Sequence, residues 1–234
     1  RTLPADAFTP VIEAVPTFGL GAGPVWLRLQ VDNPSPAPVD RVVMVGMTWL
    51  DRIDFHVFEQ GRLVSHRSGG DLGGELEAPV PGLGYLFEHR FAPGTSEVLL
   101  RVATPDPMVV PIRLMTRDSV EHERQWIAYG YGLVYGFALA LLAYNLMLYL
   151  GLGQPGYLRY SLYLGCFLLM NFAYTGHGYG WIWSAWPGFQ QYIILAMMAL
   201  FSCAGFRFAI QFLSLPEYAP RLVRSINGFC LLML

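Results

Sequence analysis

The chain has 234 residues, of which 54% are hydrophobic and 14% charged, and its formal net charge is −2. The charges are unevenly divided: residues 1–125 carry a net charge of −5, whereas residues 126–234 contain one Glu and four Arg. So few charges cannot solvate the surface of a soluble domain, which places the second half in a membrane. All 15 basic residues are Arg, and they form no cluster that could follow a phosphate backbone, which argues against nucleic acid as a partner.

The first half is predicted to consist of short strands separated by turns. After a lead-in rich in Pro and Gly, Val25–Val31 alternates apolar and polar residues, as in a strand with one buried face. Similar runs recur about every 8–15 residues without a helical period. They are Val39–Leu50, Ile53–Phe58, Arg62–His66, Tyr85–Phe91, Glu97–Ala103 and Met108–Met115. Residues 1–117 are therefore predicted to form an all-β sandwich or jelly roll.

A short charged link at residues 118–125 precedes a membrane domain predicted at residues 126–234. Ile127–Leu150 has 24 residues without Asp, Glu, Lys, Arg or His. At about 1.5 Å rise per residue, it can cross a hydrocarbon layer of roughly 30 Å. Further spans are predicted at residues 157–175 and 192–213, with a truncated fourth from about residue 222. The intervening Gly176–Gln191 contains three Trp and is expected in the headgroup region.

The arginines orient the predicted spans. The loops that contain Arg159 and Arg221 fall on one side of the membrane, and the loop that contains His177 has no Arg. The positive-inside rule places the first two loops in the cytoplasm and the β domain outside. We therefore expect a multi-pass protein of a bacterial inner membrane with a periplasmic N-terminal domain. Its export signal has been removed or precedes Arg1.

Several segments resemble one family of bacterial receptors. VWLRLQVDNPS, LDRIDFHVFEQGRLV and LLRVATPDPMVVPIRL are similar to the extracellular sensor module of seven-transmembrane receptors with diverse intracellular signalling modules. GLVYGFALALLAYNLMLYLGLGQPGYLRYSLYL and FLSLPEYAPRL resemble the opening of that family's membrane domain. The resemblance implies a jelly-roll sensor for carbohydrates or related small ligands, seven spans, and a cytoplasmic output such as a histidine kinase or diguanylate cyclase. It supplies no ligand-binding motif that transfers residue by residue.

Two groups of residues in the β domain are candidates for ligand binding. Trp49, Asp51 and Arg52 lie together at a predicted strand end, where an aromatic face with a carboxylate and a guanidinium suits a sugar or another polar ligand. The alternative is a core Trp beside a turn with a surface ion pair. Trp26 and Arg28 share the polar side of their strand, which is either a ligand face or an ordinary exposed face.

Arg207 is the charged residue of interest in the membrane domain. It lies six residues before Leu213, roughly 9 Å of helix rise from the end of the third predicted span. A charge at this depth must snorkel to the surface, pair, or face a polar cavity. One hypothesis is snorkelling to the cytoplasmic surface. The other is that Arg207 meets Asn145 or Asn171 inside the bundle and helps to set the signalling state.

Motifs for catalysis and metal binding are not found in the sequence. There is no Gly-x-Ser-x-Gly elbow and no phosphate loop, and the five His show no metal spacing. We therefore expect no enzyme within these residues, no cofactor, no metal site, and no disulfide among the three Cys. A full-length protein could still carry an enzymatic output domain.

The leading hypothesis is a transmembrane signalling receptor fragment whose periplasmic sandwich senses a small ligand, with carbohydrate as one class. The alternative is a membrane-anchored adhesion or assembly module that binds a protein partner. A homodimer or a periplasmic protein partner stays open in either case. A transporter would need polar or broken helices in the mid-membrane, and the uninterrupted Ile127–Leu150 argues against one.

Overall fold

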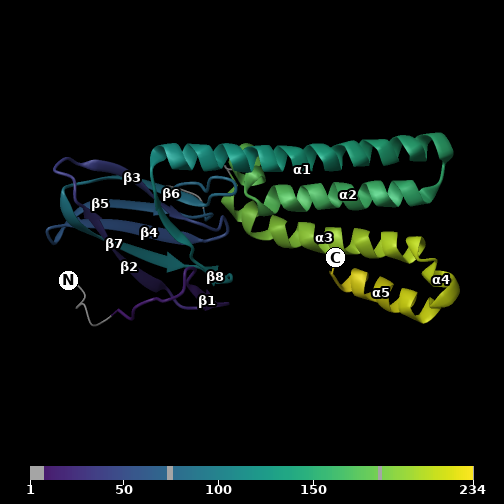
Figure 1. The fold of residues 1–234 in the computed structure, drawn as a ribbon. Helices are drawn as coiled ribbons and strands as arrows, with labels where there is room; N and C mark the ends of the chain where they lie inside the picture. The colour runs from purple at the N-terminus through teal and green to yellow at the C-terminus, as the bar shows by residue number, and fades with distance from the viewer. Residues whose placement is uncertain (1–7, 73–75, 184–185, 234) are drawn as a thin grey trace. The chain divides into compact units, whose positions relative to one another are not determined.

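The computed structural model describes residues 8–72, 76–183 and 186–233, and it contains two compact units (Figure 1). The first unit comprises Arg1–Trp126 with Gly176–Gly188, and the second comprises Ile127–Thr175 with Phe189–Leu234. The strands lie in the first unit, which also contains helical residues 117–126 and 179–183, and helices build the second unit. The predicted fold class, a β-sandwich followed by a helical region, is confirmed.

Antiparallel sheets form the first unit. A four-stranded sheet has the order β2-β7-β4-β5, a three-stranded sheet has the order β6-β3-β9, and β1 pairs with β8. The strands are β1 (Thr17–Gly19), β2 (Val25–Asn33), β3 (Val39–Val45), β4 (Arg52–Glu59), β5 (Arg62–Gly69), β6 (Tyr85–Phe91), β7 (Gly94–Ala103), β8 (Met108–Val109) and β9 (Ile112–Met115).

The hydrophobic core lies between the two larger sheets. Leu27, Leu100 and Phe55 are neighbours across β2, β7 and β4, and all three are buried. The Phe55 ring stacks on the ring of Phe87 in β6, with 4.9 Å between ring centroids. Fully burying a side chain of this kind contributes roughly 1.5–3 kcal/mol. Because side chains alternate along each strand, every second residue lies in this core and the residues between them point outward.

Two predicted strands differ in extent from the observed ones. β3 stops at Val45. Gly46 N–H still donates to the carbonyl of Pro111 at 2.9 Å, and Met47 then takes a φ of +75° that turns the chain. The predicted strand 108–115 is split into β8 and β9. Pro111 has no N–H that could donate to a neighbouring strand. The N–H of Val110 donates to the carbonyl of Pro16 and not to β3, which pairs with β9.

α1 (Arg117–Leu152) is one continuous helix that contains both the charged link and the first predicted span. Thr116 caps it: its Oγ1 accepts a hydrogen bond from the backbone N–H of Ser119 at 3.1 Å. The helix ends where Gly153 takes a φ of +66° and its N–H donates to the carbonyl of Tyr149. Its 36 residues rise about 54 Å at 1.5 Å each, so the helix is much longer than a hydrocarbon layer.

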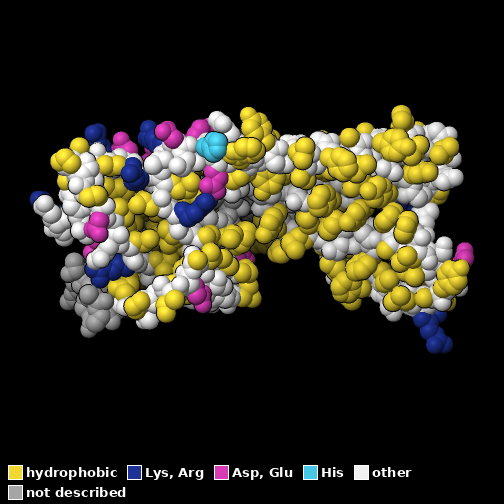
Figure 2. All heavy atoms as spheres, viewed as in Figure 1, with side chains coloured by type: hydrophobic (Ala, Val, Ile, Leu, Met, Phe, Trp, Pro, Cys, Tyr) yellow, Lys and Arg dark blue, Asp and Glu magenta, His cyan; other side chains and the backbone are white. Residues whose placement is uncertain are grey.

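The remaining helices are α2 (Pro155–Tyr174), the π-helical turn η2 (Tyr179–Trp183), α3 (Pro187–Phe212), α4 (Leu215–Tyr218) and α5 (Pro220–Met233). Among the described residues, α1 and the part of α3 from Tyr192 to Phe212 are long and apolar enough to cross a membrane. Figure 2 shows hydrophobic side chains over the helices and a concentration of charged side chains on the sandwich. The spans predicted at residues 157–175 and from residue 222 stay predictions.

The connection between α2 and α3 packs with the strands. Gly176–Gly188 belongs to the sandwich unit, and its expected place in the lipid headgroups stays a prediction. His177 and Tyr179 are buried. Gly176 has a φ of +83°, and a Cβ on it would lie 3.4 Å from Cγ2 of Thr48. This connection therefore packs next to the residues that follow β3.

Candidate ligand-binding face of the four-stranded sheet

The outer side of the four-stranded sheet carries a set of polar and aromatic residues that we call the polar face. Its first row runs across four strands: Trp26 of β2 is opposite Arg101 of β7, Arg101 is opposite Asp54 of β4, and Asp54 is opposite Ser68 of β5. Because side chains alternate along a strand, these residues point away from the core that Leu27, Leu100 and Phe55 fill. The second row contains Arg28, Leu99, His56 and His66.

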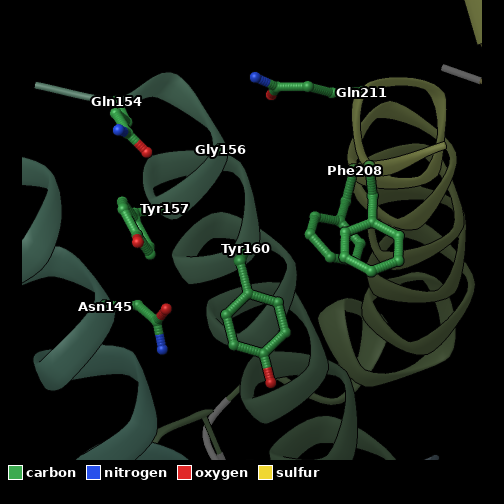
Figure 3. Close-up of a pocket in the computed structure, with 8 residues that line it drawn as sticks. Asn145, Gln154, Gly156, Tyr157, Tyr160, Phe208 and Gln211 are labelled. Carbon is green, nitrogen blue, oxygen red and sulfur yellow. The ribbon is translucent and has the colours of Figure 1, made fainter. Parts of the chain in front are cut away.

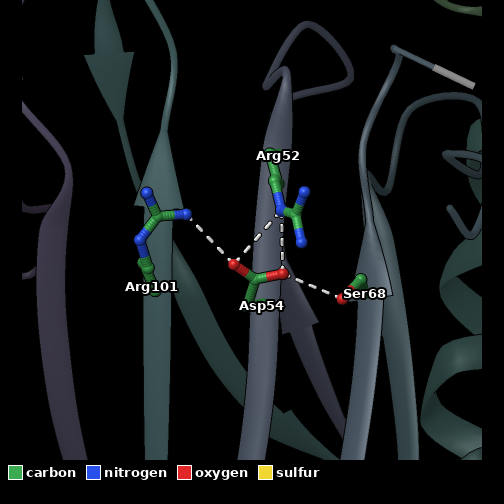
Figure 4. Close-up of polar contacts among 4 residues, drawn as sticks. All are labelled: Arg52, Asp54, Ser68 and Arg101. Carbon is green, nitrogen blue, oxygen red and sulfur yellow. Dashed lines mark hydrogen bonds and ion pairs between the residues drawn. The ribbon is translucent and has the colours of Figure 1, made fainter.

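Asp54 is the centre of the polar face (Figure 4). Its Oδ1 accepts hydrogen bonds from Arg52 Nε at 3.0 Å and from Ser68 Oγ at 2.8 Å. Its Oδ2 accepts from Arg101 Nη1 at 3.1 Å and more weakly from Arg52 Nε at 3.3 Å. The Asp54 side chain is only 8% exposed, whereas the side chains of Arg52 and Arg101 are 51% and 30% exposed. The carboxylate thus holds two arginines whose outer nitrogen atoms reach solvent.

These contacts keep Asp54 charged. Burial by itself would raise the pKa of the Asp54 carboxyl, but the hydrogen bonds from Ser68, Arg52 and Arg101 more than offset it. The pKa therefore lies below its ordinary value. Two guanidinium groups face one carboxylate, so this part of the polar face has a net positive charge at neutral pH.

Aromatic rings lie beside the charged residues. Trp26 is 41% exposed, and its ring centroid lies 6.0 Å from that of His56. His56 in turn stacks on His66 at 4.5 Å. Burial, followed by the neighbouring His66, lowers the pKa of His56 below its ordinary value, so His56 is mainly neutral at neutral pH. The exposed face of Trp26 can take the apolar side of a ring-shaped ligand.

Arg28 connects the polar face to a cavity along β2. Its Nε lies 2.6 Å from Oε1 of Glu97, and its guanidinium lies 5.7 Å from the ring centroid of Phe8. A cavity of about 650 Å³ is lined by Trp26, Arg28 and Gln30 of β2 together with residues of the N-terminal segment. Its volume is in the range that accommodates a small organic ligand.

The structure separates the candidates that sequence reasoning grouped at one strand end. Arg52 lies on the polar face, as do Trp26 and Arg28. Trp49 Nε1 donates to the carbonyl of Pro107 at 3.3 Å, and the Asp51 carboxylate accepts from Thr104 Oγ1 at 2.9 Å. The last two contacts tie the strand end to the segment between β7 and β8, away from Asp54.

Sequence reasoning missed Asp54 and Arg101. The signal was present, since IDFHVF puts Asp54 and His56 on the side opposite Phe55, and LLRVA puts Arg101 opposite Leu100. Local alternation does not reveal that β4 lies next to β7, however, and only this pairing brings Asp54 and Arg101 together.

A second group of ionisable residues, the strand-end cluster, consists of Asp51, Asp71, Tyr85 and Asp106. Asp71 is buried, and its Oδ1 has no hydrogen-bond partner in the part of the chain that the structure describes. Burial, followed by the charges of Asp51 and Asp106, raises the pKa of Asp71 to about 7. The buried Tyr85 hydroxyl donates to the carbonyls of Leu50 and Thr48 at 3.0 and 3.2 Å.

The three residues that we considered as a polar group in the membrane do not interact with one another in the structure. Arg207 is exposed on α3. The amides of Asn145 and Asn171 donate to carbonyls one turn earlier in their own helices, Leu141 at 2.8 Å and Phe167 at 3.1 Å. A role for these residues in signalling, and the snorkelling of Arg207, stay predictions.

A cavity of about 430 Å³ lies in the helical unit between α1, α2 and α3 (Figure 3). Asn145 of α1, Tyr157 and Tyr160 of α2, and Phe208 and Gln211 of α3 line it. No group of three or more His, Cys, Asp or Glu that could hold a metal ion occurs among the residues described.

An all-β domain with an outward polar face, joined to apolar helices, is typical of a membrane-bound sensor. Family comparisons agree with this class. Residues 1–116 match the model 7TMR-DISM extracellular 2, and residues 127–234 match the model 7TM diverse intracellular signalling. The chain belongs to the seven-transmembrane receptors with diverse intracellular signalling modules. Comparison with curated proteins gives no match.

Membership of this family establishes the general role of the chain. It is part of a transmembrane sensor receptor with an extracellular N-terminal domain, and both matched families are sensory or signalling domains.

Proposed function

We propose that the sandwich binds a small polar ligand on the polar face and that the helices carry the signal to a cytoplasmic output domain of a bacterial inner-membrane receptor. Carbohydrates and related molecules are the ligand class that the family suggests. The observation that carries the proposal is the arrangement around Asp54. A buried, ionised carboxylate holds Arg52 and Arg101 in place while their outer nitrogen atoms face solvent beside the exposed Trp26.

Such an arrangement suits binding because the donors are already oriented. A flexible arginine loses side-chain entropy when it binds a ligand, and a guanidinium fixed in advance loses less. Asp54 accepts at both oxygens and has three donor side chains around it, so it serves the ligand indirectly as a positioning residue.

The continuity of α1 supports signal transfer into the helices. The helix begins at Arg117, immediately after β9, and the Arg117 guanidinium pairs with Glu88 of β6. Arg113 of β9 pairs with Glu123 in the second turn of the helix. A ligand can shift an equilibrium between two signalling states only by binding one state more tightly, and a helix that starts at the sheet transmits such a difference without a flexible linker.

Thermal unfolding of the chain in lipid nanodiscs, against a panel of sugars, cell-wall fragments and small metabolites, tests the binding step. A ligand at about 100 times its Kd stabilises the folded state by about 2.7 kcal/mol. We expect at least one compound to raise the Tm and to lose this effect in Arg52→Ala. Arg90→Ala is the matched control, because Arg90 is exposed on β6 of the other sheet.

Two outcomes would contradict the proposal. A Tm shift that Arg52→Ala and Arg101→Ala both retain would place the site elsewhere on the sandwich. No shift across the panel would favour a protein partner, which periplasmic crosslinking would then identify. In a complete receptor, exchange of the sandwich for an unrelated one should abolish ligand-dependent output, whereas an adhesion module would lose attachment alone.

A further inference from the structure

The hydrogen-bonding groups that remain open on the polar face are mostly donors. Each guanidinium has several N–H donors and no acceptor. Asp54 engages only Nε of Arg52 and Nη1 of Arg101. Within the described residues, both Nη atoms of Arg52, and Nε and Nη2 of Arg101, are therefore left for a ligand. The acceptors of Asp54 are already occupied by Arg52, Arg101 and Ser68.

This imbalance limits the chemistry of the ligand. A neutral sugar offers hydroxyl groups that donate as well as accept, and it is held best by a site with both kinds of partner. A carboxylate only accepts, and it fits the planar fork of a guanidinium with two parallel hydrogen bonds. The open groups around Asp54 therefore match an anionic group better than a hydroxyl.

The charge of the face points to the same ligand. Arg52 and Arg101 outnumber Asp54 by one positive charge, and the nearby Arg28 is already neutralised by Glu97 at 2.6 Å. One unit of positive charge is thus left on the Asp54 side of the face. A single carboxylate would neutralise this charge, whereas a neutral ligand would leave it uncompensated.

The aromatic side of the face favours a ligand with a ring. Trp26 is the cross-strand neighbour of Arg101, and neighbouring strands lie roughly 4.8 Å apart. A six-membered ring resting on Trp26 would therefore hold a substituent on its edge within reach of Arg101. Stacking on the exposed indole adds apolar contact that a free inorganic anion could not make.

We propose that the polar face binds a cyclic carboxylate of the uronic-acid type, with the ring on Trp26 and the carboxylate on the open nitrogen atoms of Arg52 and Arg101. The inference rests on the proposed function, because it names the ligand class of the same face. Asp54 acts as the positioning residue that holds the two guanidinium groups.

Isothermal titration of the chain in nanodiscs of zwitterionic lipid tests the inference with paired probes. D-glucuronate and D-galacturonate are compared with D-glucose and D-galactose, which have the same ring without the carboxylate. We expect each uronate to bind about tenfold or more tightly than its neutral partner, as a charged hydrogen bond typically contributes. The difference should shrink several-fold at high salt, because surface charges are screened.

Variants assign the contacts. Arg101→Gln should lower uronate affinity about tenfold and leave the weak binding of the neutral sugars unchanged. Trp26→Ala should weaken both members of each pair. Arg90→Gln, on the opposite sheet, should change neither. Circular dichroism and the Tm of each variant check that the sandwich is still folded.

The outcomes separate this inference from the proposed function. Equal affinity for uronates and neutral sugars, or no uronate binding, overturns the ligand class. If another compound of the panel then binds and depends on Arg52, the proposed function stands without the inference. Inorganic sulfate that binds as tightly as the uronates, with no effect of Trp26→Ala, would also overturn it, because the ring would then contribute nothing.

Discussion

Two buried carboxylates of the same sandwich have opposite surroundings. On the polar face, Ser68 and two arginines surround Asp54, and its pKa is lowered despite burial. In the strand-end cluster, Asp71 has acidic neighbours, and its pKa is raised to about 7. Burial alone therefore does not decide whether a carboxylate is charged; the groups that neighbouring strands and loops supply decide it. Asp54 stays ionised at neutral pH, whereas Asp71 titrates there.

The largest expected effect is a pH dependence that comes from Asp71. Its folded-state pKa of about 7 lies above the ordinary value of 3.8. The stability that this group contributes is thus complete below about pH 3.8, decreases as pH rises, and is lost above about pH 7. At roughly 1.4 kcal/mol per pH unit, the loss is at most about 4 kcal/mol. Hydrogen exchange of buried amides in β4 and β7 between pH 5 and 8, corrected for intrinsic rates, measures it.

Asp71→Asn is the variant that checks the assignment. An amide does not ionise, so this variant should lose much less stability between pH 5 and 8 than the unmodified chain. Asp40→Asn is the control, because Asp40 is exposed on β3. This variant should show the same pH dependence of stability as the unmodified chain. An unaltered pH profile in Asp71→Asn would contradict the interpretation of the strand-end cluster.

The next effect is the loss of Asp54. Asp54→Ala leaves the guanidinium groups of Arg52 and Arg101 facing each other without their shared carboxylate. Removing one partner of a buried ion pair typically costs 3–5 kcal/mol. The two arginines are partly exposed, so we expect a lower loss of about 2–3 kcal/mol in the free energy of opening of β4 and β7.

Hydrogen exchange again provides the measurement, with Asp40→Ala as the exposed control. A change within about 0.5 kcal/mol is typical of a surface site. If Asp54→Ala and Asp40→Ala had equal effects, the Asp54 cluster would be a surface contact without a structural role, and the comparison of the two carboxylates would fail.

Much of the sandwich could be predicted from sequence because its strands alternate clearly. Val25–Val31 and Ile53–Phe58 lie within β2 and β4, and the outward position of Trp26 and Arg28 follows from the same alternation. The contact between Asp54 and Arg101 could not be predicted. Asp54 and Arg101 are 47 residues apart in sequence, and strand order is a property of the whole sheet that no local pattern contains.

The strand-end cluster was hidden for a similar reason. Asp71 lies in a segment rich in glycine that is typical of a loop, and such a residue is normally expected in solvent. Its ionisable neighbours come from other parts of the chain: the charges of Asp51 and Asp106 raise its pKa, and its own charge raises the pKa of Tyr85. Tertiary packing, not local sequence, determined the state of this carboxylate.

A smaller effect is expected for the Tyr85 hydroxyl. Tyr85→Phe keeps the ring in the core and removes the donor to the carbonyls of Leu50 and Thr48. Leaving buried acceptors without a donor costs roughly 1–3 kcal/mol, so we expect a loss of about 1–2 kcal/mol in the Tm-derived free energy. An equal Tm for Tyr85→Phe and the unmodified chain would mean that water replaces the hydroxyl at the strand end.

The smallest effect concerns Glu88, a carboxylate that is exposed and has one cationic partner. Glu88 pairs with Arg117 at the start of α1, and the two side chains are 49% and 68% exposed. Exposed ion pairs of this kind contribute about 0.2–1 kcal/mol and weaken with salt. A double-mutant cycle with Glu88→Gln and Arg117→Gln, measured by Tm at low and high salt, should give a coupling in this range that disappears at high salt. A coupling above about 2 kcal/mol that resists salt would contradict this prediction, because it would show that the pair is shielded from solvent.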